Sequence, residues 1–224
     1  MPSPMTAALP FLAALAAYLV GSLSFAVIVS RAMGLSDPRT YGSGNPGATN
    51  VLRSGSKAAA ILTLALDALK GYLPVALAVR FGPAHGLGEG TVAMVALAAF
   101  VGHLWPVFFR FKGGKGVATA GGAVLGIDPL LGAATLATWL IIVAFFRYSS
   151  LASIVAAVFA PFWHVLTDGP DVIAIALLAI SGLLIWRHSA NIKRLFAGTE
   201  SRVGSKAAPV SGAASAKGRR AARR

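Results

Sequence analysis

One stretch of the sequence combines small flexible residues with positive charge, a composition that can bind phosphate. Residues 108–119 read Phe-Phe-Arg-Phe-Lys-Gly-Gly-Lys-Gly-Val-Ala-Thr, with an apolar run on either side. Glycines can turn several backbone N–H groups inward, and the first turn of a following helix adds unpaired N–H groups and a positive dipole end. A flexible basic turn at a membrane surface is the alternative interpretation. The candidate phosphate-binding residues are Lys112, Gly113, Gly114, Lys115, Gly116 and Thr119.

A second glycine-rich stretch, residues 42–53, reads Gly-Ser-Gly-Asn-Pro-Gly-Ala-Thr-Asn-Val-Leu-Arg. It contains Gly-x-Gly-x-x-Gly, but a dinucleotide site also needs a preceding strand and a βαβ unit, which this sequence does not offer. What remains is a loop with hydroxyls and amides, closed by an arginine that can bind phosphate with two parallel N–H bonds. A purely structural loop is the alternative. The candidates here are Ser43, Gly44, Asn45, Gly47, Thr49, Asn50 and Arg53.

A third cluster follows the last apolar run. His188, Asn191 and Arg194 are spaced three apart, which predicts that they share one face of a short helix, and Glu200 follows soon after. A basic helix beside the membrane would explain Arg194 and its neighbour Lys193. It would not explain His188 or Asn191.

Three further ionisable residues lie in or at the end of apolar runs. Asp67 and Lys70 are three residues apart, so they can pair on one helix face. Charge inside a membrane span usually faces the protein interior. We expect an ion pair that supports the site, with direct substrate contact as the alternative. His103, near the end of a run, is expected to support the site, and a packed, hydrogen-bonded histidine is the simpler interpretation.

The elements that must position these residues are apolar helices. The chain has 224 residues, of which 56% are hydrophobic and only 12% charged, whereas a soluble domain carries about twice that charged fraction. Its mean hydropathy is +0.73. Cysteine is absent, which excludes disulfides and thiolate chemistry. The apolar segments are residues 9–30, 58–79, 91–109, 117–126, 129–146, 151–166 and 172–186.

These segments predict an all-α polytopic membrane protein with seven transmembrane helices. The fourth is short, since a span needs about 20 residues. The first run lacks a signal-peptide pattern and is interpreted as a retained helix. Residues 1–200 would form the membrane domain, and residues 201–224 a disordered basic tail that touches anionic lipid.

The distribution of Lys and Arg predicts the orientation. Of 20 such residues, 18 fall on one side: four in residues 31–57, three in residues 110–115, one at Arg147 and ten from Arg187 onward. Positive loops stay in the cytoplasm, so we expect a periplasmic N-terminus, a cytoplasmic C-terminus and all three clusters on the cytoplasmic face. The net charge of +13 is then explained by the membrane, and no nucleic acid partner is expected.

Together these motifs closely resemble the bacterial membrane acyl-phosphate:glycerol-3-phosphate acyltransferases (the PlsY type). The resemblance extends from Leu9 to Glu200. It rests on residues 42–53, 66–71 (Leu-Asp-Ala-Leu-Lys-Gly), 102–119, 147–153 (Arg-Tyr-Ser-Ser-Leu-Ala-Ser) and 187–200, with His-x-x-Asn-Ile-x-Arg-Leu-x-x-Gly-x-Glu.

The resemblance implies a seven-helix enzyme of the inner membrane. It would move a fatty acyl group from acyl phosphate to the 1-hydroxyl of sn-glycerol 3-phosphate, giving lysophosphatidic acid and phosphate, the first acylation step of phospholipid synthesis. No metal or cofactor is implied, and we expect function as a monomer. The expected catalytic residues are Arg53, Lys115, His188 and Asn191, with Arg194 among the phosphate-binding residues and Asp67, Lys70, His103 and Glu200 in support.

Two other functions fit the sequence less well. An organic-phosphate transporter would need a polar path through the bilayer, whereas the polar residues of this sequence stop on one face. An acyl-CoA enzyme of the soluble-domain type carries His-x-x-x-x-Asp, and no histidine here has Asp five positions later. For the acyl phosphate reaction we expect direct attack by the hydroxyl, with the proton taken by the departing phosphate and His188 as the alternative base.

Overall fold

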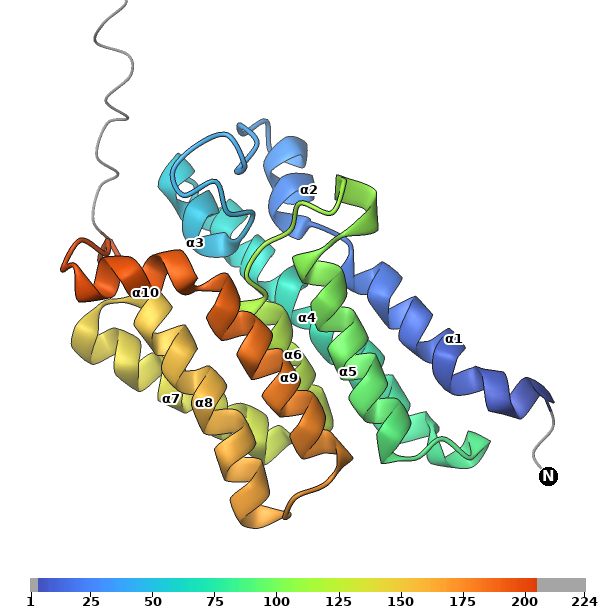
Figure 1. Cartoon of the computed structure of the whole chain (residues 1–224). Helices are drawn as coiled ribbons and strands as arrows, with labels where there is room; N and C mark the ends of the chain where they lie inside the picture. Colours follow the sequence, from blue (N-terminus) through green and yellow to red (C-terminus); the bar gives the residue numbers. More distant parts are fainter. Residues whose placement is uncertain (1–3, 205–224) are drawn as a thin grey trace, which may run out of the picture.

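The computed structural model describes residues 4–204, and within that range every regular element is helical (Figure 1). Three short 3-10 turns lie at residues 52–54, 83–85 and 107–109. The α-helices are α1 (Pro4–Gly21), α2 (Phe25–Ala32), α3 (Ala48–Val51), α4 (Lys57–Phe81), α5 (Glu89–Leu104), α6 (Val117–Ile127), α7 (Pro129–Phe146), α8 (Ser149–Thr167), α9 (Val172–Arg187) and α10 (Ser189–Phe196).

The expected all-α, multi-pass membrane architecture is confirmed. Within the described range, α4, α5, α7 and α8 are each long and apolar enough to cross a membrane, and the number rises to six if the bent pairs α1–α2 and α9–α10 each form one span. The seventh apolar segment is α6, which at 11 residues is too short to span alone as a straight helix. The count of seven crossings therefore stays a prediction.

Two predicted segments, the first and the third apolar runs, are interrupted for identifiable reasons. The first run is broken at residues 22–24, where the chain bends by 41° and the Lys70 ammonium takes the carbonyl of Leu23 at 2.6 Å. The third run ends at Leu104, because Pro106 forces the preceding Trp105 out of the helical region. At the end of the last run a 59° bend separates α9 from α10, with His188 in the bend.

Side-chain caps start several helices where the sequence offers a Ser or Asp. Ser56 accepts the Ala59 N–H at 3.2 Å, Asp128 accepts the Leu131 N–H at 2.6 Å, and Asp171 accepts the Ala174 N–H at 2.7 Å. Each cap satisfies one of the N–H groups that a helix start leaves unpaired. The loops that separate the apolar helices are thereby fixed in position.

α5 lies at the centre of the bundle, packed against α1, α4, α6 and α9. Its inward side chains, among them Val95, Phe100 and Leu104, are almost completely buried. The most extensive helix contacts are those of α4 with α6 and of α1 with α5. Small residues at a helix interface let the backbones approach, which is a main source of helix association in membranes.

The α4–α6 contact depends on two glycines. A Cβ on Gly122 of α6 would lie 2.8 Å from the carbonyl carbon of Ala68, and one on Gly71 of α4 would lie 2.9 Å from that of Thr119. Both distances are shorter than real Cβ contacts. Because α6 follows the glycine loop directly, this contact also determines where that loop ends.

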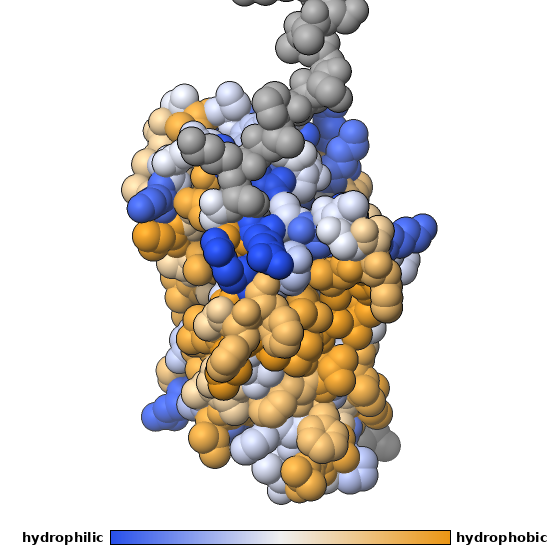
Figure 2. All heavy atoms as spheres, turned by 90° about the vertical axis from the view of Figure 1, so that its left-hand side faces the viewer, coloured by the Kyte–Doolittle hydropathy of each residue, from blue (hydrophilic) through white to orange (hydrophobic). Residues whose placement is uncertain are grey.

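Polar residues gather at one end of the bundle. Figure 2 shows a broad hydrophobic band, with the hydrophilic residues concentrated near α10 and fewer at the opposite end. The first turn of α1 lies at the end of the bundle opposite to α10 (Figure 1). The band and the uneven charge are those of a protein whose middle contacts lipid.

The described chain continues past α10 as an ordered segment, Thr199–Gly204. The Val203 N–H donates to the Arg147 carbonyl at 2.7 Å, and the Arg147 guanidinium donates to the Val203 carbonyl at 3.1 Å. The predicted boundary between membrane domain and tail falls inside this segment. The rest of the predicted tail, residues 205–224, lies outside the described residues.

Candidate active site

The three predicted clusters lie at the same end of the bundle. In Figure 1 the loop that contains α3, the loop that leads into α6 and the helix α10 all lie at the upper end of the helices. The backbones of the two glycine loops meet: a Cβ on Gly114 would lie 2.9 Å from the carbonyl oxygen of Pro46. Residues some 150 positions apart in sequence therefore form one polar surface.

A hydrogen-bond network centred on Glu200 joins the glycine loop to α10. The Lys115 ammonium donates to the Asn191 amide oxygen. The Asn191 amide nitrogen donates to Glu200 at 2.6 Å, and the Arg194 Nε donates to the other carboxylate oxygen at 2.7 Å. The Ser150 hydroxyl at the start of α8 donates to Glu200 at 2.7 Å. As expected, Asn191 and Arg194 share a face of α10.

The electrostatic surroundings of Lys115 are strongly positive. Burial lowers the pKa of Lys115 to about 8; the Glu200 carboxylate opposes this, while the charges of Arg194, Arg187 and Arg53 lower it further. Four cationic side chains thus act on one another across a single site, with Glu200 as the partner of Arg194. The cluster has an excess of positive charge that an anionic ligand would neutralise.

His188 lies in the bend between α9 and α10 and is 2% exposed. Its Nδ1 donates to the Leu184 carbonyl at 2.8 Å, which leaves Nε2 as an acceptor in the neutral ring. Burial lowers the pKa of His188 to about 4; the bond to Leu184 opposes this and the charge of Lys115 adds to it. At neutral pH His188 is an uncharged ring and a weak base.

The glycine loop is held on two sides. The Gly114 N–H donates to the His103 carbonyl at 3.2 Å. From the other side, the Arg187 guanidinium donates to the Gly113 carbonyl at 3.0 Å and to the Gly114 carbonyl at 3.1 and 3.0 Å. Gly116 then turns the chain into α6 with φ +82°, a conformation that favours glycine.

The predicted ion pair lies beneath this loop. Asp67 and Lys70 face each other at 2.8 Å, both almost fully buried, and the expectation that they share a face and pair is confirmed. His103 connects the pair to α6: its Nδ1 is 3.8 Å from the Asp67 carboxylate and 3.1 Å from the Thr119 hydroxyl. These four side chains connect α4, α5 and α6 below the site.

Two of the candidate phosphate ligands have side chains that are both buried and hydrogen-bonded within the protein. Asn50 is buried, accepts the Ser43 N–H at 3.0 Å and donates to the carbonyls of Pro38 at 2.6 Å and Tyr41 at 3.2 Å. Thr119 is fully buried and bonded to His103. Both side chains therefore hold loop or helix backbone in place.

The remaining candidates are more accessible. Ser43, Gly44, Thr49, Arg53 and Lys112 are exposed, and Asn45 and Gly47 are partly buried. Arg53 donates to the Ser201 hydroxyl at 2.9 Å, so the segment after α10 reaches the first glycine loop. Within the described residues no group of three or more His, Asp or Glu side chains could hold a metal ion.

Sequence reasoning missed two residues of the site. In the sequence, Arg187 is only one of the positive charges at the end of an apolar run, and Ser150 is only part of the motif at residues 147–153. The contact of Arg187 with the glycine loop gives no local signal, because 73 residues separate Arg187 from Gly114. Nothing in the local sequence indicates that Ser150 meets Glu200, because 50 residues separate them.

An all-helical membrane bundle with a basic, glycine-lined site at one end defines the general class as a membrane enzyme for anionic substrates. Comparison with known proteins is more specific. The family model "Glycerol-3-phosphate acyltransferase" matches residues 11–198. The chain is 70% identical over 193 residues to the glycerol-3-phosphate acyltransferase of Cupriavidus taiwanensis, covering 86% of this chain and 96% of that protein. With the Ralstonia nicotianae protein of the same name it is 64% identical over 197 residues, covering 88% and 95%.

Two solved structures are also similar. Both are crystal structures of PlsY (YgiH), an integral membrane glycerol 3-phosphate acyltransferase. The glycerol 3-phosphate form is 39% identical with a TM-score of 0.81, covering 87% of this chain and 96% of that one. The lysophosphatidic acid form is 38% identical with a TM-score of 0.80, covering 88% and 97%. The chain belongs to the glycerol-3-phosphate acyltransferase family, and it is an acyltransferase of phospholipid synthesis.

Proposed function

We propose that this enzyme transfers a fatty acyl group from acyl phosphate to the 1-hydroxyl of sn-glycerol 3-phosphate, giving lysophosphatidic acid and inorganic phosphate. The observation that carries the proposal is the convergence of Lys115, Arg53, Arg187 and Arg194 on one site. The glycerol 3-phosphate and lysophosphatidic acid forms of the two similar structures support the choice of acceptor and product.

The charges of the substrates match those of the site. Each monoester-like phosphate carries about −1.5 to −2 at neutral pH, so two of them bring about four negative charges. Arg53, Lys112, Lys115, Arg187 and Arg194 bring five positive charges, and Glu200 neutralises one of them, which leaves about that number. The loop residues Ser43, Gly44, Asn45, Gly47, Thr49, Gly113, Gly114 and Gly116 would contribute uncharged donors or backbone N–H groups. We assign Asn50 and Thr119 to holding the loops in place.

Acyl phosphate is already activated, so the reaction needs no covalent enzyme intermediate. The acceptor hydroxyl attacks the carbonyl carbon, the bond from that carbon to the phosphate oxygen breaks, and the leaving phosphate takes the hydroxyl proton. Lys115 and the glycine-loop N–H groups stabilise the charge that develops on the leaving phosphate. His188, with Nε2 available as an acceptor, and Asn191 would orient the acceptor. Asp67, Lys70, His103 and Glu200 support these groups.

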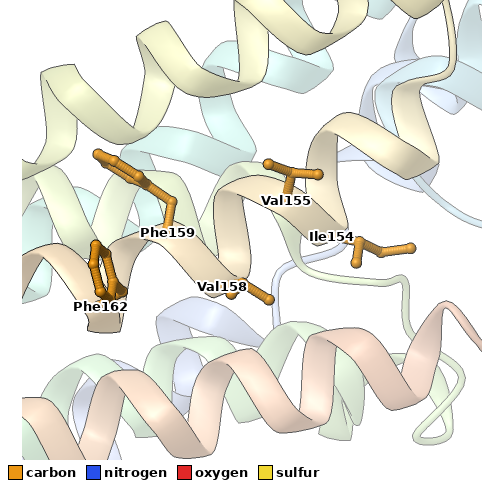
Figure 3. A pocket seen from close by; sticks show the side chains of 5 residues that line it. All are labelled: Ile154, Val155, Val158, Phe159 and Phe162. Carbon is orange, nitrogen blue, oxygen red and sulfur yellow. The ribbon is translucent and has the colours of Figure 1, made fainter.

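An apolar groove on α8 offers a place for the acyl chain. Ile154, Val155, Val158, Phe159 and Phe162 line a hollow of about 300 Å³. Figure 3 shows that all five side chains come from α8 and follow one another along the helix. The groove begins one helical turn beyond Ser150, which bonds to Glu200 at the site. A chain lying there would extend from the polar end into the bilayer.

The proposed setting is the bacterial inner membrane. The protein would cross it seven times as a monomer, with the N-terminus periplasmic, the C-terminus cytoplasmic and the site facing the cytoplasm. Soluble glycerol 3-phosphate could then reach the site from the cytoplasm while the acyl donor arrives through the lipid. The concentration of Lys and Arg at the site end supports this orientation.

The choice of acyl donor tests the proposal. Purified enzyme in detergent or nanodiscs is given glycerol 3-phosphate with either palmitoyl phosphate or palmitoyl-CoA, and lysophosphatidic acid is measured by mass spectrometry. We expect product only with palmitoyl phosphate, because the glycine loops and the cationic side chains around Lys115 suit a small anion such as the phosphate of this donor. Comparable turnover with palmitoyl-CoA would overturn the donor assignment.

A further inference from the structure

Arg187, the last residue of α9, faces the glycine loop and not an acidic partner. Its guanidinium spans two successive carbonyls, those of Gly113 and Gly114, with three N–H···O bonds of 3.0 to 3.1 Å. Among the residues that the structure describes, no Asp or Glu forms an ion pair with it. A planar guanidinium can form this fork, whereas an ammonium donates from a single point.

The bond pattern determines which way the loop's N–H groups point. In a trans peptide the C=O and the N–H point in opposite directions. With the carbonyls of Gly113 and Gly114 turned toward Arg187, the N–H groups of Gly114 and Lys115 face away from it. The Gly114 N–H is taken by the His103 carbonyl. The N–H groups of Lys115 and Gly116 form no hydrogen bond within the described residues.

These free donors lead directly into the first turn of α6, which begins at Val117. A guanidinium on the carbonyl side also polarises both peptides, which makes their N–H groups stronger donors. The loop has three glycines in four positions, so without such a brace its backbone would be free to turn. Part of the free energy of substrate binding would then be used to order the loop, which would weaken the affinity for substrate.

We propose that Arg187 is a positioning residue for the acyl transfer: it fixes the carbonyls of Gly113 and Gly114, so that the free N–H group of Lys115 is held toward the substrate phosphate. The inference rests on the proposed function of this site. Arg187 acts through the backbone and not by contact with substrate. The geometry of its fork, more than its charge, is what the site requires.

The experiment compares Arg187→Lys with Arg187→Gln in the purified full-length enzyme. Lysine keeps the charge and loses the fork, whereas glutamine loses the charge. We measure KM and kcat with acyl phosphate and glycerol 3-phosphate, the inhibition constant of inorganic phosphate, and thermal unfolding. We expect both variants to weaken phosphate inhibition and raise KM by about tenfold or more, to a similar extent, with unfolding temperatures near that of the wild type. The matched control is Arg80→Lys. Arg80 lies in the last turn of α4, at the end of the bundle opposite to the site, so this variant should leave KM, kcat, phosphate inhibition and thermal unfolding unchanged.

Two outcomes would overturn the proposal. If Arg187→Lys behaves as the wild type while Arg187→Gln is impaired, Arg187 acts by its charge on the substrate. If both folded variants keep the wild-type phosphate inhibition constant, the arginine has no part in the anion site. Protection of the wild type against heat by inorganic phosphate is recorded in parallel and does not depend on the acyl donor. A wild-type enzyme that phosphate stabilises but that makes no product from acyl phosphate would contradict the proposed function alone. The two failures are therefore distinguishable.

Discussion

At the scale of single residues, burial changes the pKa values of two side chains in the site. His188 and Lys115 face the same polar cluster, and burial lowers the pKa of both. The consequences for function differ. Burial makes the ring of His188 a neutral, weak base, and it brings the pKa of the Lys115 ammonium to about 8, close to working pH. Each residue leads to a kinetic prediction.

His188→Ala should raise the KM for glycerol 3-phosphate and leave the shape of the pH–rate profile largely intact. The reason is that a ring with a pKa of about 4 orients the acceptor hydroxyl better than it removes its proton. The measurement is steady-state kinetics from pH 5.5 to 9. His85→Ala, in an exposed turn at the other end of α4, is the control. Near-complete loss of kcat at unchanged KM, with disappearance of a pKa near neutrality, would make His188 the base.

For Lys115 we expect a pH effect in the alkaline range. Its pKa of about 8 in the free enzyme means that the ammonium loses its proton as pH rises through 8, and kcat/KM, which reports the free enzyme, should fall there. Lys115→Arg stays charged over this range, so its lower activity should show no such fall. Lys193→Arg, exposed on α10, is the control. A fall near pH 8 that persists in Lys115→Arg would assign it to another group.

At the scale of elements, apolar runs predicted the helices well, but not where they break. Hydropathy shows that residues 9–30 suit a membrane. It does not show that Lys70, forty-seven residues away, donates a hydrogen bond to the Leu23 carbonyl at the break. The same limit applies to the site: residue types and spacing indicated both glycine loops and the α10 face, whereas the bonds of Arg187 to the glycine loop and of Ser150 to Glu200 depend on how distant helices pack.

The α4–α6 contact gives an element-scale prediction. Gly122→Ala would place a methyl group 2.8 Å from the Ala68 carbonyl carbon, so the helices must separate, and we expect a loss of about 1–3 kcal/mol in stability. Gly121→Ala is a closely matched control, since nothing lies within 4 Å of its Cβ position. Thermal unfolding in one detergent compares the two. Equal unfolding temperatures would contradict the assigned role of the contact.

At the scale of the whole molecule, orientation in the membrane is the main prediction. Reporter domains fused after Ile127 or Gly169 should be periplasmic, and one fused after Arg187 cytoplasmic, because Lys and Arg collect on the side of Arg187. The measurements are the activity of a fused phosphatase and the fluorescence of a fused reporter that fluoresces only in the cytoplasm. A cytoplasmic result after Gly169 would overturn the seven-crossing arrangement.

The segment after α10 has a consequence for the order in which the enzyme becomes complete. Glu200 and Ser201 leave the ribosome after all the apolar helices, yet they bond to Ser150, Asn191, Arg194 and Arg53. Chains fold broadly in the order of their synthesis. The nascent protein can therefore insert its helices up to α8 while Lys115 has no carboxylate near it, and the site reaches its final charge balance only after α10 and Glu200 have been made.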